Sequence, residues 1–212
     1  MSSTCTDKAQ AYDLKEVPDE ATRNALPDAG SAYTVSKILS HVAANDFVEQ
    51  NKVSFDLIRV MPGLICGANE HYRSSAEMRN PLVLGSNQGI MRTALPIPQG
   101  GPRITHQVLL DDVAKAHVLS LKPEVAKNGD NFILAGNDGV GMPWEDFVPV
   151  IQRLFPDAVA NGVLKPEVTD PNFIERYDVS GSEKALGFKY AGPEEMVKSV
   201  VGQYIKFVEA EA

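Results

Sequence analysis

Tyr33 and Lys37, four residues apart in the run Ser-Ala-Tyr-Thr-Val-Ser-Lys, carry the clearest chemical signal in this sequence. The apolar residues that follow recur with helical period, so both side chains lie on one face of an expected helix that ends near Gln50. A lysine charge at about 4 Å stabilises a phenolate by roughly 4 kcal/mol at an effective dielectric constant of about 20. A lysine at that distance is therefore expected to favour proton transfer by the phenol near neutral pH. The pair is a candidate acid–base catalyst.

Flanking segments strengthen this interpretation, because the spacing alone arises often by chance. A hydroxyl-rich run, Ser-Ser-Thr, occupies positions 2–4, and a strand-like apolar stretch that starts at Ser54 is closed by Pro62-Gly63. A hydroxyl cluster, a Tyr-x-x-x-Lys helix and a strand that ends in Pro-Gly resemble the short-chain dehydrogenase/reductase superfamily. The resemblance is greatest to its extended branch, the NAD-dependent epimerase/dehydratase type, which contains dihydroflavonol reductases, related ketoreductases and nucleotide-sugar epimerases.

Three later motifs also resemble that branch. They are a strand and helix around Asp-Val-Ala at 107–119, a strand at 130–136 followed by Pro-Trp-Glu-Asp-Phe, and Ser-Glu-Lys-Ala-Leu-Gly-Phe at 182–188. The resemblance implies an α/β fold with the latter half of a Rossmann-type parallel sheet and a smaller C-terminal substrate-binding region. We expect residues 1–67 to form the latter part of the dinucleotide-binding domain. Residues 68–212 are expected to form mainly the substrate-binding region, with some strands returning to the sheet.

The same resemblance implies roles for individual side chains. It makes Tyr33 the general acid that delivers a proton to a substrate carbonyl oxygen. Lys37 is implied to lower the pKa of that tyrosine and to hydrogen-bond the nicotinamide ribose. The serine that holds the substrate oxygen aligns with Ser3, and Ser2 and Thr4 are the alternatives because the register depends on three residues.

Cofactor contacts are expected from the backbone of Pro62, Gly63 and Leu64, which the resemblance directs toward the nicotinamide carboxamide. A plain strand terminator is the alternative interpretation of this Pro-Gly pair. The glycine-rich turn that holds the pyrophosphate in the superfamily does not occur before Tyr33, and the glycines of 136–141 have the reversed spacing typical of a tight turn. The sequence therefore looks like the C-terminal portion of a longer enzyme. NADP is favoured over NAD as the cofactor, with weak binding expected for this chain alone.

The remaining pattern predicts loops and regular elements in alternation. Residues 68–101 lose periodicity and gain Gly, Pro, Asn and Ser, which is typical of an active-site flap rather than of core. The paired acids Asp111 and Asp112 are expected at the N-cap and in the first turn of a helix. The expected strands and helices are a strand at 104–110, a helix at 111–121, a strand at 131–135, a helix at 144–155 and a last helix from Pro193.

Composition excludes several classes of partner. The net charge of −8 argues against nucleic acid and anionic membranes, both of which select for basic faces. No apolar segment approaches the roughly 20 residues that a bilayer requires, so a cytoplasmic protein is expected. Cys5 and Cys66 are expected to be reduced thiols, and the four histidines show no ligand spacing, so no metal is implied.

These observations favour an NAD(P)H-dependent oxidoreductase, a ketoreductase of the extended type, which transfers hydride to or from a small-molecule carbonyl or alcohol. A secondary metabolite is favoured over a nucleotide sugar as the substrate. The alternative is a truncated, non-catalytic pseudoenzyme or interaction module that lacks competent cofactor binding. A homodimer through the Tyr33 helix is a candidate assembly.

Overall fold

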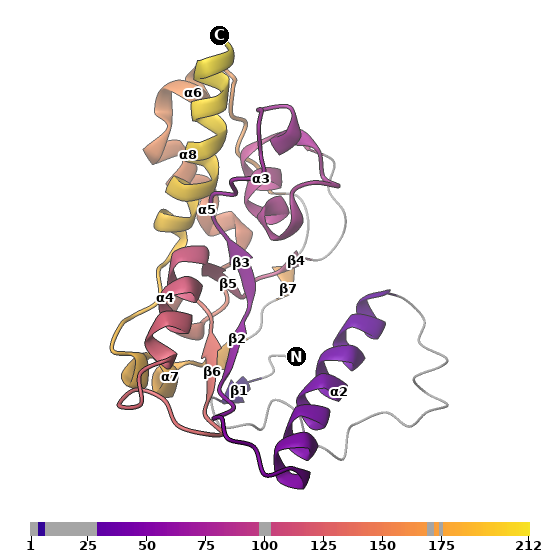
Figure 1. Cartoon of the computed structure of the whole chain (residues 1–212). Helices are drawn as coiled ribbons and strands as arrows, with labels where there is room; N and C mark the ends of the chain where they lie inside the picture. Colours follow the sequence, from indigo (N-terminus) through magenta and orange to yellow (C-terminus); the bar gives the residue numbers. More distant parts are fainter. Residues whose placement is uncertain (1–3, 7–28, 98–102, 169–171, 174–175) are drawn as a thin grey trace.

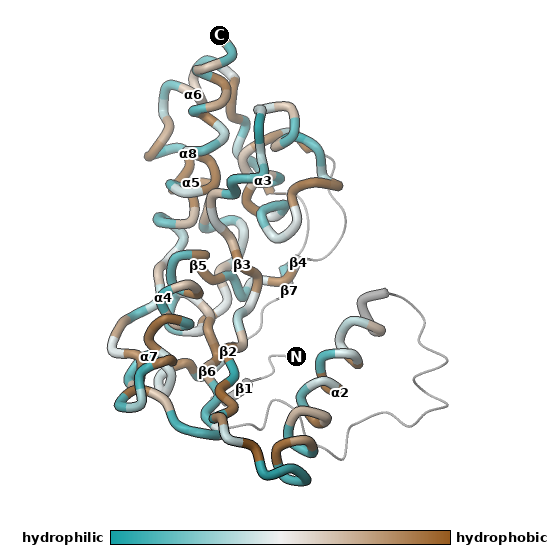
Figure 2. Tube along the Cα trace, in the orientation of Figure 1, coloured by the Kyte–Doolittle hydropathy of each residue, from teal (hydrophilic) through white to brown (hydrophobic). Residues whose placement is uncertain are grey.

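Parallel strand pairs form the framework of the protein, as expected of a Rossmann-type α/β fold. The computed structural model describes residues 4–6, 29–97, 103–168, 172–173 and 176–212 (Figure 1). Among these residues, the paired strands are β2 (Arg59–Pro62) with β6 (Asn131–Leu134), β3 (Leu64–Cys66) with β5 (Gln107–Leu109), β1 (Thr4–Thr6) with β8 (Arg176–Asp178), and β4 (Arg103–Ile104) with β7 (Asn172–Phe173). Hydrophobic residues concentrate along the central strands (Figure 2), as the double burial of parallel sheets requires.

Each strand pair is a separate two-stranded parallel sheet, and the chain passes from the β2–β6 sheet to the β3–β5 sheet at Gly63. The Gly63 amide donates to the Leu134 carbonyl at 2.9 Å, and the next amide, that of Leu64, donates to the His106 carbonyl at 2.9 Å. A Cβ atom at Gly63 would lie 2.1 Å from that His106 oxygen, so the approach of the two backbones requires glycine here. The strand-like stretch predicted from 54 onward is therefore regular only from Arg59, and it continues beyond Pro-Gly to Cys66.

Helices account for most of the rest of the described chain. The bounds are α2 (Ala29–Gln50), α3 (Gln88–Ala94), α4 (Leu110–Ser120), α5 (Phe147–Leu154), α6 (Pro156–Ala160), α7 (Ser180–Leu186) and α8 (Pro193–Glu211). Helix α2 ends at Gln50 and helix α8 begins at Pro193, as predicted. In α8 the proline occupies the first turn, directly after the N-cap residue Gly192. Pro149 lies in the first turn of α5. The backbone amides of a first turn donate no hydrogen bond within the helix, so the amide hydrogen that proline lacks is not needed there. None of the helices in these described ranges is long and apolar enough to cross a membrane.

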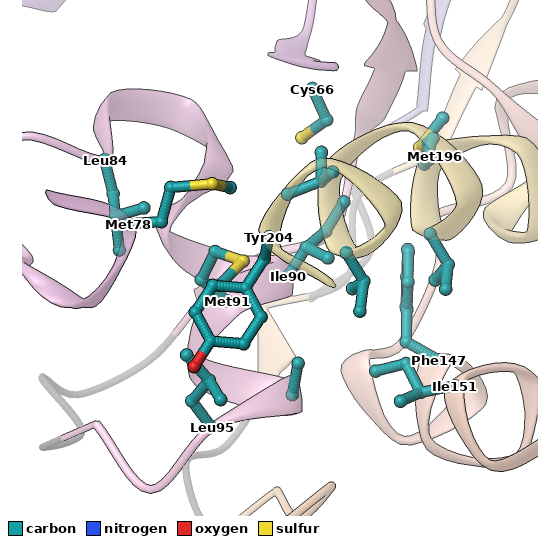
Figure 3. Close-up of a cluster of buried hydrophobic side chains, with 14 of the residues drawn as sticks. Cys66, Met78, Leu84, Ile90, Met91, Leu95, Phe147, Ile151, Met196 and Tyr204 are labelled. Atoms are coloured by element: carbon teal, nitrogen blue, oxygen red, sulfur yellow. The ribbon is translucent and has the colours of Figure 1, made fainter. Parts of the chain in front are cut away.

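The larger of two buried clusters packs α3 and α5 against the apolar face of α8 (Figure 3). The expectation that residues 68–101 form a flap outside the core is wrong, because this segment contributes much of that cluster. Its buried side chains include Tyr72, Met78, Leu84 and Ile90. These residues lie on separate short turns and on α3, so their spacing in the sequence follows neither the helical nor the strand period. The sequence of this segment therefore resembled that of a polar loop.

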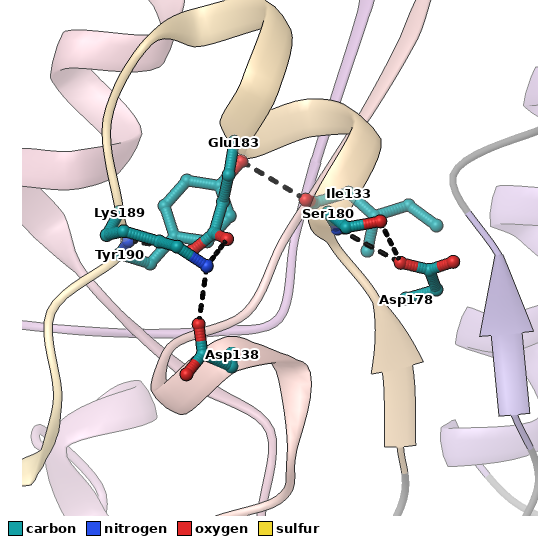
Figure 4. Close-up of polar contacts among 7 residues, drawn as sticks. All are labelled: Ile133, Asp138, Asp178, Ser180, Glu183, Lys189 and Tyr190. Atoms are coloured by element: carbon teal, nitrogen blue, oxygen red, sulfur yellow. Dashed lines mark hydrogen bonds and ion pairs between the residues drawn. The ribbon is translucent and has the colours of Figure 1, made fainter.

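The second buried cluster lies between the β2–β6 pair and helices α4 and α7. The side chain of Glu183 is buried there, where its carboxylate accepts a hydrogen bond from the Tyr190 amide at 3.1 Å and lies 2.5 Å from the ammonium of Lys189 (Figure 4). The same ammonium lies 2.7 Å from Asp138, in the turn after β6. These contacts attach the segment after α7 to the sheet. A buried carboxylate is tolerated when its oxygens are paired in this way.

Smaller predictions near these clusters are partly confirmed. The glycines of 136–141 form a tight turn in which Asn137 and Asp138 have positive φ angles of 56° and 53°. Cys66 is a buried free thiol, and burial raises its pKa to about 12. The side chain of Cys5 lies outside the described residues.

The expected N-cap role of the paired acids is wrong, because α4 begins one residue earlier. Leu109 is the N-cap residue, so both Asp111 and Asp112 lie in the first turn. Asp112 instead accepts a hydrogen bond from the Ala191 amide at 2.7 Å, and burial raises the pKa of its carboxyl group. The acid therefore joins α4 to the segment that precedes α8.

Two glycine substitutions test the packing of the larger cluster. A Cβ atom at Gly89 in α3 would lie 2.1 Å from the indole of Trp144, so Gly89→Ala is expected to lower the free energy of unfolding by about 1–3 kcal/mol. The matched control is Gly202→Ala within α8, where the nearest neighbouring atom is 3.8 Å away. It is expected to raise stability by up to about 1 kcal/mol, because alanine favours helix more than glycine. Urea titration followed by the fluorescence of Trp144, the single tryptophan, measures both; equal effects would contradict this packing.

Candidate active site

The first turns of α2 bring Tyr33 and Lys37 together on one face of the helix, as predicted. The Lys37 ammonium lies 5.3 Å from the centroid of the Tyr33 ring. The tyrosine is 65% exposed, so its hydroxyl is accessible to a molecule from solution. A phenol beside an ammonium can donate a proton, and the cation stabilises the phenolate that remains.

The serine hydroxyls near the Tyr–Lys pair are hydrogen-bonded to the backbone of α2. The hydroxyl of Ser36 donates to the Tyr33 carbonyl at 2.7 Å, and that of Ser40 donates to the Ser36 carbonyl at 2.8 Å. Both hydroxyls are therefore turned back onto the helix backbone. Val35, in contrast, is buried. The phenol of Tyr33 and the ammonium of Lys37, in contrast, belong to exposed residues.

Helix α2 stands to one side of the sheet and of the other helices (Figure 1). Its C-terminal half is joined to the sheet by Arg59, whose guanidinium donates to the side-chain oxygen of Asn45 on α2 and, at 3.3 Å, to that of Asn131 on β6. His41 lies one turn before Asn45. Burial and the charge of Arg59 lower the pKa of this histidine, and burial lowers the pKa of Arg59 itself.

The predicted cofactor-binding backbone lies at the change of partner between β2 and β3. The amides of Gly63 and Leu64 both donate within the sheet, to the carbonyls of Leu134 and His106. Any contact from this segment to a nicotinamide carboxamide would therefore use carbonyl oxygens rather than these two amides. The role of Pro62, Gly63 and Leu64 stays a prediction.

The structure does not bring all of the predicted site residues together. The N-terminal half of α2, which carries the Tyr–Lys pair, lies away from the β2–β3 junction (Figure 1). Ser3 and its alternative Ser2 lie outside the described residues, and of Thr4 only the backbone, in β1, is described. The assignment of the substrate-holding hydroxyl therefore stays a prediction as well.

Arg59 is the residue of this region that the sequence reasoning did not single out. The available signal was a charged residue inside the apolar run Leu-Ile-Arg-Val-Met, since a half-buried charge requires partners. His106 was also passed over as a site residue. Its ring contacts that of Tyr177 edge-on, with 5.2 Å between the centroids, directly beside Gly63.

Comparison with known proteins identifies similar sequences. No family model matches the chain. The chain is 34% identical over 183 residues to the ketoreductase CTB6 of Cercospora beticola, which covers 84% of this chain and 49% of the relative. It is 27% identical over 201 residues to the ketoreductase sphI of Aspergillus fumigatus, which covers 92% of this chain and 56% of the relative. The chain thus spans about half the length of the curated relatives it matches.

A solved structure shares the fold. Gre2 of Candida albicans in complex with NADPH superposes with a TM-score of 0.70 at 23% identity, over 97% of this chain and 58% of that protein. This likeness supports the fold, while the sequence relatives carry the family assignment. The resemblance that the motifs predicted is confirmed, because the relatives and the shared fold are of the extended short-chain dehydrogenase/reductase type.

Proposed function

We propose that this chain carries the proton-transfer machinery of an NADP(H)-dependent ketoreductase that acts on a small-molecule carbonyl or the corresponding alcohol. The observation that carries the proposal is the Tyr33–Lys37 pair, with the ammonium 5.3 Å from an exposed phenol ring. Two relatives named ketoreductases support it, as does the likeness to an NADPH complex. These names favour the reductase over the non-catalytic alternative.

The residues present fit one end of the cofactor. An ammonium and a phenol on adjacent turns offer hydrogen-bond donors of the kind that ribose hydroxyls accept. The sequence contains no glycine-rich fingerprint for the pyrophosphate, which is the part that such a turn holds. When bound, NADP(H) supplies or accepts the hydride. Lys37 would hold the nicotinamide ribose. The carboxamide contact proposed for the backbone at Pro62–Leu64 is a separate prediction, because this segment lies away from the Tyr–Lys pair in the structure (Figure 1).

Proton transfer is the task proposed for Tyr33. Its hydroxyl donates a hydrogen bond to the substrate carbonyl oxygen and releases its proton to that oxygen as the carbonyl carbon gains a hydride. The phenolate that remains is stabilised by the neighbouring Lys37 ammonium, and a proton from solvent restores the acid. In the oxidative direction the phenolate accepts the proton of the alcohol. Ser3 is proposed to orient the substrate oxygen.

The setting of this chemistry is also part of the proposal. We place the protein in the cytoplasm, with a secondary metabolite as the favoured substrate class. A homodimer through α2 is supported by the exposure of its large apolar side chain Phe47, which is 54% exposed. Neither nucleic acid nor a membrane is proposed as a partner, in keeping with the net charge of −8.

Cofactor affinity is expected to be weak for the chain described here. Without a phosphate-binding turn, NADPH is expected to bind with a dissociation constant of about 1 mM or weaker, equivalent to roughly −4 kcal/mol. Isothermal titration calorimetry or nicotinamide fluorescence measures this constant. A micromolar value would show that this chain holds the dinucleotide without the glycine-rich turn.

Removal of the Tyr33 hydroxyl tests the catalytic assignment. Tyr33→Phe is expected to lower kcat by a factor of about 10² to 10⁴, because a positioned acid is lost. Lys37→Met is expected to weaken NADPH binding as well as the rate. Alcohol formation from a panel of small ketones, measured by chromatography above the dissociation constant of NADPH, provides the rates.

The matched control for this substitution is Tyr72→Phe. It removes a phenol hydroxyl that donates to the Leu84 carbonyl at 2.9 Å in the larger buried cluster, so it is expected to reduce stability and leave kcat nearly unchanged. Turnover by Tyr33→Phe close to that of the unsubstituted protein would refute the role given to the phenol.

A further inference from the structure

We propose that Arg59 is a positioning residue that sets where α2 presents Tyr33 and Lys37, through a guanidinium bridge from the sheet to Asn45. The consequence for catalysis rests on the proposed function. The bridge itself does not, because it is a feature of the packing between α2 and the sheet. The two parts are therefore testable separately.

Arg59 is fixed to the sheet at both its backbone and its side chain. Its amide donates to the Asp130 carbonyl at 3.0 Å, and the residue pairs with Asn131 as the first step of the β2–β6 ladder. One arm of the guanidinium donates to the side-chain oxygen of Asn131 at 3.3 Å, which directs the other arm outward. Because the guanidinium is planar and rigid, fixing one arm also fixes the direction of the second.

The second arm reaches helix α2. It donates to the side-chain oxygen of Asn45, a residue on the same helix face as His41, one turn earlier. The lowered pKa of His41, caused by burial and then by the charge of Arg59, agrees with a guanidinium close to this face. A hydrogen bond from a charged donor is among the stronger single contacts available to a partly buried pair. The bridge therefore joins the helix to the start of the central strand.

The position of the bridge along α2 makes it sensitive for the chemistry. Asn45 lies about 18 Å along the helix from Tyr33 and about 12 Å from Lys37, at 1.5 Å per residue. A tilt of about 5° at Asn45 would move the tyrosine end by roughly 1.6 Å, whereas catalytic groups tolerate displacements of about 0.5 Å. The contact at Arg59 is thus distant from the proton-transfer groups and still determines their placement.

Substitutions at Asn45 test the bridge without altering the Tyr–Lys pair. Asn45→Ala removes the acceptor, and Asn45→Asp keeps an acceptor oxygen for the guanidinium. The matched control is Gln50→Ala, which removes an amide side chain from the exposed end of the same helix. Hydrogen–deuterium exchange of α2 and α8 amides, measured by mass spectrometry, requires neither NADPH nor turnover.

Asn45→Ala is expected to speed amide exchange in α2 by about tenfold. The exchange rates in α8 are expected to stay unchanged, because the lost contact does not involve that helix. Asn45→Asp and Gln50→Ala are expected to exchange as the unsubstituted chain does. Equal exchange in Asn45→Ala and the unsubstituted chain would overturn the bridge. An Asn45→Asp variant that loosens as much as Asn45→Ala would also overturn it.

Kinetics test the positioning role. We expect kcat to fall about tenfold or more in Asn45→Ala with KM little changed, and to recover in Asn45→Asp, because orientation rather than binding is lost. Faster exchange with an unaltered kcat would overturn positioning. Absence of turnover in the unsubstituted chain would count against the proposed ketoreductase function, and the exchange result would still decide whether the bridge exists.

Discussion

The close approach of the Gly63 and His106 backbones is the constraint on which the rest of the structure depends. It lets one continuous stretch of chain pair with β6 before the glycine and with β5 after it. The two buried clusters lie around this path, with Cys66 at its end in the larger cluster and Val60 beside the smaller one. A side chain at Gly63 would separate these strands and so disturb both clusters.

The same path leads into the candidate site. Arg59 begins it and reaches outward to α2, so the strand that organises the two clusters also supports the helix that carries Tyr33 and Lys37. The Tyr–Lys pair is exposed on a helix that stands to one side of the sheet (Figure 1). Within the described part of the chain, the bridge from Arg59 to Asn45 is therefore a contact on which the placement of the reactive groups depends.

Sequence reasoning succeeded where local signals and tertiary packing agree. Helix α8 combines apolar periodicity with a clear start at Gly192 and Pro193, and the pairing of Tyr33 with Lys37 follows from helix geometry alone. It failed over 68–101, because Met78 and Leu84 are buried from separate turns whose spacing has no period. It also missed Arg59, since the partners of this residue come from segments distant in sequence, which a single chain without structure does not disclose.

Isotope transfer addresses the central claim, that this chain carries the proton-transfer machinery of a carbonyl reductase. The chain is incubated with NADPH deuterated at nicotinamide C4 on the transferring face and with a small ketone, and the alcohol is analysed by mass spectrometry and NMR. The ketoreductase proposal predicts one deuterium on the carbinol carbon and a solvent-derived proton on oxygen. Formation of alcohol without deuterium at that carbon would contradict the proposal. So would the absence of alcohol when NADPH, labelled on either face, is present above its dissociation constant.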